Sequence, residues 1–285
     1  MRCFDGSAKG EDLKKLVALA AITLITATAL AGSASANHSW GKYHWARTSN
    51  PFTIALGNNT TSAWSSLLST ASGDWTASSV LNTNIVSSNK NRATCEPTLG
   101  RVEVCNYDYG NNGWLGLAQI WIYRGGSHIA QGVVELNDYY FSGGGSSYAY
   151  NNTAEKQHVV CQEVGHTFGL DHQSETGASL NTCMDYYHNT SNSDTQSTHP
   201  NQGDYDELRC IYDPAVKRVT LTSGGHTCRG TGHLDSFNSA GASPGSFFPG
   251  ARASFAPGTQ VGESKYVDRL PDGGLLVTWI TWANR

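Results

Sequence analysis

QEVGHTFGLDH, residues 162–172, is the stretch that decides how the rest of this chain is interpreted. In a helix, side chains four positions apart lie on one face, about 5–6 Å apart at Cβ, so Gln162 and His166 would be close enough to bind the same ion. Glu163 is rotated by about 100° from Gln162 and would flank that ion without binding it. The spacing therefore predicts a helix that carries a metal site near its C-terminal end.

A turn is expected directly after this helix. Gly169 permits the positive φ that ends a helix, and the turn would bring His172 back as a third ligand. His158 lies one helical turn before the stretch and would replace a ligand only if the helix shifted by a turn. Asp171 and Asp185 would either orient the ligand imidazoles or serve as cap or turn residues.

The stretch matches the pattern HExxHxxGxxH at every specified position except the first, where Gln162 replaces histidine. The run TCMDY, residues 182–186, follows it and contains Met184 and Tyr186. The chain has only 2 methionines, one of which is the initiator, so the position of Met184 is informative. On these residues the chain resembles the metzincin metallopeptidases, which carry the long motif followed by a methionine-containing turn. The resemblance covers residues 50–213.

The resemblance implies an α+β fold, with a twisted mixed β-sheet, an N-terminal backing helix, an active-site helix and a C-terminal helix. It implies a zinc ion bound by Gln162, His166 and His172. Glu163 would be the general base that takes a proton from the metal-activated water, and Tyr186 would stabilise the oxyanion or act as a labile ligand. Gln162 departs from the family pattern, because a neutral amide oxygen suits calcium better than zinc and should weaken zinc binding.

Three functions remain open at this point. The first is a secreted zinc endopeptidase that hydrolyses peptide bonds in protein or peptide substrates. The second is a catalytically silent binding module of the same fold, suggested by the missing histidine. The third is a calcium-stabilised extracellular protein, suggested by Asp204, Asp206 and Glu207, although these acids do not follow EF-hand spacing.

Composition and charge limit the possible partners and cellular locations of the protein. The formal net charge is −4, and no cluster of basic residues supplies the footprint of a nucleic-acid binder. Residues 1–36 resemble a secretory signal, with an apolar run that is short for a membrane span. An uncleaved anchor is the alternative, because Asp5, Glu11 and Asp12 are atypical for the start of a signal. We therefore expect an extracellular monomer with no membrane segment after cleavage. Residues 37–213 would form the catalytic domain, and residues 214–285 a β-rich extension with no assigned role.

The cysteines fit an oxidising compartment. The chain has 7 cysteines, and one of them, Cys3, falls in the expected signal segment, which leaves an even number. No CxxC spacing supports the competing interpretation, a zinc–thiolate cluster. By proximity in sequence we expect the pairs Cys95–Cys105, Cys161–Cys183 and Cys210–Cys228.

Hydrophobic periodicity predicts the main elements. Strands are expected at 51–57, 80–86, 102–106, 115–123, 128–136 and 275–282. Helices are expected from Thr61 to about Trp75, at about 154–168, and at 204–212. Within this set, 128–136 would be either the antiparallel edge strand that receives an extended peptide or an ordinary strand of the sheet.

Overall fold

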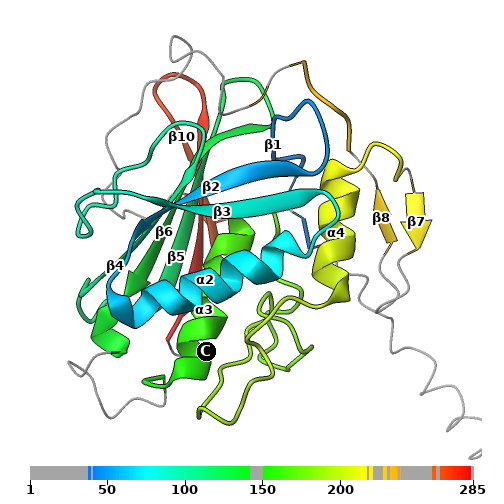
Figure 1. The fold of residues 1–285 in the computed structure, drawn as a ribbon. Coiled ribbons are helices and arrows are strands. Elements are labelled where there is room, and N and C mark those ends of the chain that lie inside the picture. The colour runs from blue at the N-terminus through cyan, green and yellow to red at the C-terminus, as the bar shows by residue number, and fades with distance from the viewer. Residues whose placement is uncertain are drawn as a thin grey trace, which may run out of the picture. The chain divides into compact units, whose positions relative to one another are not determined.

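The computed structural model describes residues 38–39, 41–141, 150–216, 218–220, 227–229, 232–236, 238, 259–260 and 264–283 (Figure 1). The expected signal segment, residues 1–36, lies outside these residues. Within the part of the chain that is described, no helix is both long enough and apolar enough to cross a bilayer.

The described residues form a mixed α/β structure with three α-helices. The helices are α2 (Ser62–Thr76), α3 (Thr153–His166) and α4 (Gln202–Tyr212), and a 3₁₀ turn, η1 (Asp138–Tyr140), follows β6. The strands are β1 (His44–Trp45), β2 (Phe52–Asn59), β3 (Leu81–Ser87), β4 (Val102–Tyr107), β5 (Trp114–Ile122), β6 (His128–Asn137), β7 (Arg218–Thr220), β8 (Thr227–Arg229), β9 (Thr259–Gln260), β10 (Lys265–Arg269) and β11 (Leu275–Trp282).

Nine of these strands form one mixed sheet, in the order β3-β2-β4-β6-β5-β11-β10-β9, with β1 paired to β6. The strands β3, β2, β4 and β6 run parallel to one another, and β5 is antiparallel to β6. The strand β6 therefore lies inside the sheet, so of the two alternatives for residues 128–136 the ordinary strand is confirmed and the edge strand is wrong. The strand that runs antiparallel to β6 is β5, and β11 pairs with the edge of β5 that faces away from β6.

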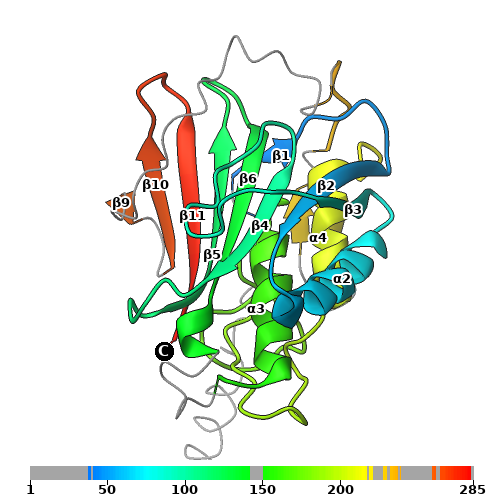
Figure 2. The same cartoon turned by 60° about the vertical axis from the view of Figure 1, so that its left-hand side comes forward.

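The C-terminal residues belong to this same sheet. The strand β11 pairs antiparallel with β5 from Leu275↔Ile122 to Trp282↔Trp114, and β10 and β9 continue the sheet beyond it (Figure 2). A β-rich C-terminal segment was expected, but as an extension of the catalytic domain rather than as part of its sheet. The strand of residues 275–282 is confirmed at its predicted position.

The helices α2 and α3 pack together against the sheet and form the core. The predicted apolar face of α2 is confirmed, because Trp64, Leu68 and Trp75 are buried in the largest hydrophobic cluster. The Trp75 ring meets Phe168 edge to face, with ring centroids 5.8 Å apart. Figure 2 shows α2, α3 and α4 gathered on one side of the strands. This arrangement is compatible with the expected α+β fold.

The helix α3 begins and ends where local chemistry favours it. The side chain of Asn152 caps its first turn by accepting from the backbone N–H of Glu155 at 2.9 Å. The helix ends at His166, two residues earlier than expected, and Gly169 then adopts φ +93°. A Cβ at this glycine would lie 2.5 Å from the carbonyl oxygen of Tyr43, so the turn requires glycine.

Two expected disulfides are confirmed. One joins Cys95 to Cys105, and the other joins Cys161 of α3 to Cys183 beside Met184. The second disulfide attaches α3 to the segment that carries Met184. Cys210 is also disulfide-bonded, but its expected partner, Cys228, lies outside the side chains that the structure describes.

We predict that Gly165→Ala destabilises the protein by about 1–3 kcal/mol, although alanine is the better helix former. A Cβ at Gly165 would lie 2.6 Å from the Met184 sulfur and 2.6 Å from the Trp75 ring, so α3 could not keep its distance from either. Denaturant unfolding gives the measurement. The control is Gly73→Ala in α2, where a new Cβ meets nothing within 4 Å; it should stabilise the protein by about 0.5–1 kcal/mol. Equal effects would contradict this account.

Candidate active site

The imidazoles of His166 and His172 face each other at the end of α3. Their Nε2 atoms lie 3.0 Å apart, and the rings meet edge to face. The Nδ1 atom of His166 lies 2.9 Å from the carbonyl oxygen of Leu170, and the Nδ1 atom of His172 lies 2.9 Å from the carboxylate of Glu175. Both of these partners are acceptors only, so each Nδ1 carries a hydrogen, and in the neutral form of each ring Nε2 presents a lone pair.

Burial opposes a charge on one member of this pair. His166 is fully buried, and burial together with the neighbouring His172 holds the pKa of His166 well below its usual value. Two Nε2 lone pairs that face each other at 3.0 Å repel unless a proton or a metal ion lies between them. The arrangement is therefore a donor pair suited to a cation.

Gln162 is held by hydrogen bonds at both ends of its amide. Its Nε2 donates to the carbonyl oxygen of Asp185 at 2.7 Å, and its Oε1 accepts from the hydroxyl of Thr281. The amide is fully buried beside Glu163. An amide oxygen has two lone pairs, so one remains after the bond from Thr281. Coordination of a metal by Gln162 remains a prediction.

Glu163 lies beside Gln162 and shares the same hydroxyl. Its Oε1 atom is 2.5 Å from Thr281 Oγ1, and its Oε2 atom is buried without a hydrogen-bond partner. Burial raises the pKa of Glu163 to about 8. The Thr281 hydroxyl has one hydrogen for two acceptors, so a protonated Glu163 would satisfy both contacts by donating to Thr281 while Thr281 donates to Gln162.

Tyr186 also lies in the site, but its hydroxyl faces the C-terminal segment. The ring is 4.6 Å from the His172 ring between centroids. The hydroxyl donates to the carbonyl oxygen of Ile280 and bonds to Ser264. Its expected role as an oxyanion donor therefore requires these contacts to break.

The strand β11 covers this site with side chains from one of its faces. Residues at alternate positions of a strand point the same way, which places Val277, Trp279 and Thr281 toward α3. The Trp279 ring stacks on the His166 imidazole, with centroids 5.2 Å apart and planes at 7°. Trp279 Nε1 donates to Asp171 at 3.2 Å, and Lys265 of β10 forms an ion pair with Asp171. The site is closed to solvent, since Glu163 and His166 are 0% exposed.

Sequence analysis missed Trp279 and Thr281 as site residues. The alternating pattern of 275–282 predicts their shared face, but no local spacing indicates which helix that face meets. Of the two alternatives for Asp171 and Asp185, the contacts agree with cap or turn residues, because neither carboxylate bonds to an imidazole nitrogen of His166 or His172. Asp171 accepts from the backbone N–H of His172, and Asp185 accepts from three groups of its own loop region.

His158 is not a ligand in this arrangement. Its Nδ1 lies 3.3 Å from Glu155 and its Nε2 lies 3.1 Å from the carbonyl oxygen of Asp185. Both partners accept hydrogens, so the ring is protonated, in agreement with its raised pKa, for which contact with Glu155 outweighs burial. His188 also bonds to Glu155, at 2.5 Å. This group is an ion network beneath the site.

The calcium hypothesis gains no support from the described residues. Asp204 closes the capping box of α4 with Asn201 and also accepts from Gln173 and Thr182. Two clusters of three or more His, Cys, Asp or Glu ligand atoms occur among the described residues, and the acids of α4 are in neither. His166 and His172 are in neither as well, because their third expected ligand is an amide.

Comparisons with known proteins add little. No family model matches this chain, and no curated protein matches it. Among solved structures, that of myroilysin aligns at 13% identity over 72% of this chain and 94% of that chain, with a TM-score of 0.25. A similarity at that score supports no conclusion about fold or function.

We predict that the stability of the protein falls between about pH 4.5 and pH 2 because of Glu155. Burial opposes its charge, but His158 and His188 outweigh burial and hold the pKa of Glu155 at about 2. A carboxylate whose pKa is lower in the folded state than in the unfolded state stabilises the folded protein at pH values above the unfolded pKa. This contribution to the free energy of unfolding is about 3 kcal/mol, and it is lost as the pH falls through the folded pKa.

Denaturant unfolding at several pH values measures this slope. Glu155→Gln should remove most of it. The control is Glu96→Gln at an exposed acid, which should retain it. An unchanged slope in Glu155→Gln would show that other groups control acid unfolding.

Proposed function

We propose that this chain is a secreted, zinc-dependent endopeptidase that acts on protein or peptide substrates. The observation that carries the proposal is the pair of Nε2 lone pairs that His166 and His172 direct at each other across 3.0 Å. A tetrahedral zinc ion, with Zn–N distances of about 2.0–2.1 Å, places two nitrogen ligands about 3.3 Å apart. The pair is therefore spaced for one ion.

We assign Gln162 as the third ligand of this ion, because its amide oxygen keeps one lone pair after the bond from Thr281. When bound, a zinc ion supplies Lewis acidity that lowers the pKa of a coordinated water to about 7. Glu163 is the proton acceptor in this proposal, because one of its two carboxylate oxygens, Oε2, has no hydrogen-bond partner. Glu175 and the Leu170 carbonyl fix the tautomers of the two imidazoles.

Substrate access requires β11 to move, because the proposed catalytic groups are buried beneath Trp279 and Thr281. The strand β11 pairs antiparallel along the outer side of β5. An extended peptide that took its place would make the same main-chain hydrogen bonds to β5 and would lie over Glu163. The C-terminal strand thus occupies the proposed substrate position, and the closed chain is latent. The two disulfides among the described cysteines agree with an extracellular setting.

A silent binding module is the second candidate. The hydrogen bonds that the Gln162 amide makes at both ends, to Asp185 and to Thr281, favour it, because these bonds hold the closed arrangement without a metal. The two candidates differ in zinc content and in chelator-sensitive cleavage after β11 is loosened.

We predict that Thr281→Val raises cleavage of casein about tenfold over the unsubstituted chain. Loss of the hydroxyl leaves Gln162 and Glu163 without their shared partner, which costs the closed state about 1–3 kcal/mol. The matched control is Thr278→Val on the opposite face of β11, where the hydroxyl bonds to Gln119 instead. Adding Glu163→Gln to Thr281→Val should lower the rate by at least about 100-fold with zinc retained. Zinc binding without chelator-sensitive cleavage in Thr281→Val would favour the silent module.

We also predict that Gln162→His tightens zinc binding by at least about tenfold, since imidazole is a stronger zinc ligand than a neutral amide oxygen. Competition against a chelator of known affinity measures the dissociation constant. Weaker binding in Gln162→His would show that the site is built around the amide, and unchanged binding would remove residue 162 from the ligand set.

A further inference from the structure

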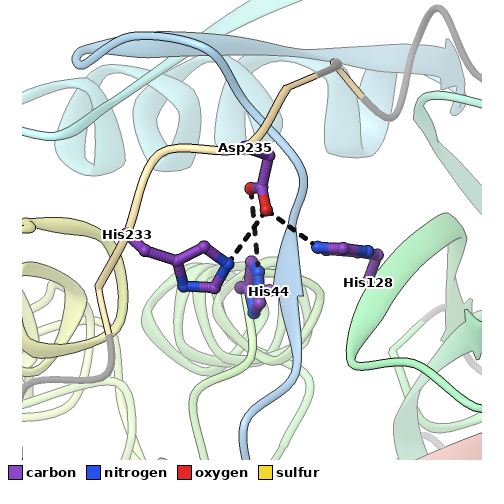
Figure 3. A group of neighbouring side chains, drawn as sticks. All are labelled: His44, His128, His233 and Asp235. Carbon is purple, nitrogen blue, oxygen red and sulfur yellow. Dashed lines mark hydrogen bonds and ion pairs between the residues drawn. The ribbon is translucent and has the colours of Figure 1, made fainter.

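A second group of potential ligands lies away from the proposed active site. His44 and His128 are register partners on the parallel strands β1 and β6. His233 and Asp235 come from the segment that follows α4. Figure 3 shows the three imidazoles arranged around the Asp235 carboxylate. Three segments that are far apart in sequence thus bring four donors together, and their ligand atoms all lie within 4.8 Å of one another.

The distances suit a tetrahedral ion. Asp235 Oδ1 is 3.0 Å from His128 Nε2 and 2.9 Å from His233 Nε2, and Asp235 Oδ2 is 3.8 Å from His44 Nε2. Ligand atoms about 2.0–2.2 Å from a tetrahedral zinc ion lie about 3.3–3.5 Å from one another. The observed distances lie on both sides of that value, so small rotations of the side chains would admit the ion.

His44 is the member of the group whose ligand atom has no hydrogen-bond partner. Its Nδ1 donates to the carbonyl oxygen of Lys42 at 2.6 Å, which leaves Nε2 as the nitrogen that faces the group. The ring is 4% exposed, and this Nε2 has no hydrogen-bond partner. A buried polar atom without a partner is unfavourable, and a cation bound between this Nε2 and the Asp235 carboxylate would satisfy it.

The second oxygen of Asp235 is held by Arg47. Arg47 Nη1 lies 3.3 Å and the Arg47 backbone N–H lies 3.2 Å from Oδ2. Arg47 is itself anchored, since its Nη2 donates to the carbonyl oxygen of Tyr212 at 2.5 Å. The carboxylate is therefore fixed in orientation, with Oδ1 turned toward the imidazoles of His128 and His233. Such supporting contacts are typical of metal ligands.

We propose that His44, His128, His233 and Asp235 bind one zinc ion with a structural role. Three imidazoles and one carboxylate form a set that zinc accepts, and four protein ligands leave no open position for a substrate. The ion would fasten the segment 232–236 to β1 and β6. Backbone contact already places it there, because the Asp235 N–H donates to the carbonyl oxygen of Arg47 at 2.8 Å.

This site does not depend on the proposed peptidase activity. The two zinc sites have no residue in common, and the closed ligand set points to stability rather than catalysis. In the absence of metal, Asp235 would still accept hydrogens from His128 and His233, and only His44 would remain unsatisfied. The experiment must therefore distinguish a metal site from a network of hydrogen bonds.

The test is zinc stoichiometry by elemental analysis of the full chain, after removal of metal and dialysis against zinc. His233→Ala should contain one equivalent less than the unsubstituted chain. His172→Ala should also lose one equivalent, from the proposed active site, and the double variant should lose two. The matched control is His199→Ala, because the His199 and His233 side chains are 57% and 54% exposed and each is paired with an aspartate. His199→Ala should keep the full zinc content.

Thermal unfolding gives a second readout. Zinc should raise the melting temperature of His172→Ala, in which only the structural site remains, and not that of the double variant. Circular dichroism establishes that each variant is folded. Equal zinc content in His233→Ala and His199→Ala, or a melting temperature of His172→Ala that zinc does not change, would overturn the structural site. Loss of zinc in His172→Ala alone would support the proposed active site and overturn the structural site. Loss of zinc in His233→Ala alone would support the structural site and contradict zinc binding at the proposed active site.

Discussion

Two imidazole nitrogens that face each other across 3.0 Å impose the main constraint on this structure. The Leu170 carbonyl accepts a hydrogen bond from Nδ1 of His166, and the Glu175 carboxylate accepts one from Nδ1 of His172. Neither ring can therefore relieve the contact between the Nε2 atoms by changing tautomer. The turn at Gly169 is what brings the second ring back against the first. The helix, the turn and the acceptors together create a position that only a proton or a metal ion can stabilise.

The C-terminal strand β11 covers the pair of imidazoles and the residues beside it. By extending the sheet past β5, β11 places Trp279 on the His166 ring and the Thr281 hydroxyl between Gln162 and Glu163. These contacts close the site to solvent. A site that is complete in its polar groups but covered by its own chain is consistent with a latent enzyme, and the same contacts would serve a binding module that never opens.

Much of the fold follows from local pattern. The amphipathic spacing of α2, the run that forms α3, and the strands from β2 to β6 were all predicted close to their observed bounds, because side-chain periodicity records which face is buried. Two disulfides followed from proximity in sequence. Strand order did not follow, and β6 proved to be internal rather than an edge. Periodicity shows which face of a strand is buried, but β6 is buried on both faces and so carries no information about its neighbours.

The sequence by itself determined the pair His166 and His172, the general-base candidate Glu163 and the glycine turn, since these depend on spacings of a few residues along one helix and its end. Tertiary structure alone decided that Thr281 covers them. It also decided that three distant segments meet around Asp235. Contacts between distant segments depend on how the sheet is ordered and closed, and that order results from the packing of the whole core rather than from any local stretch.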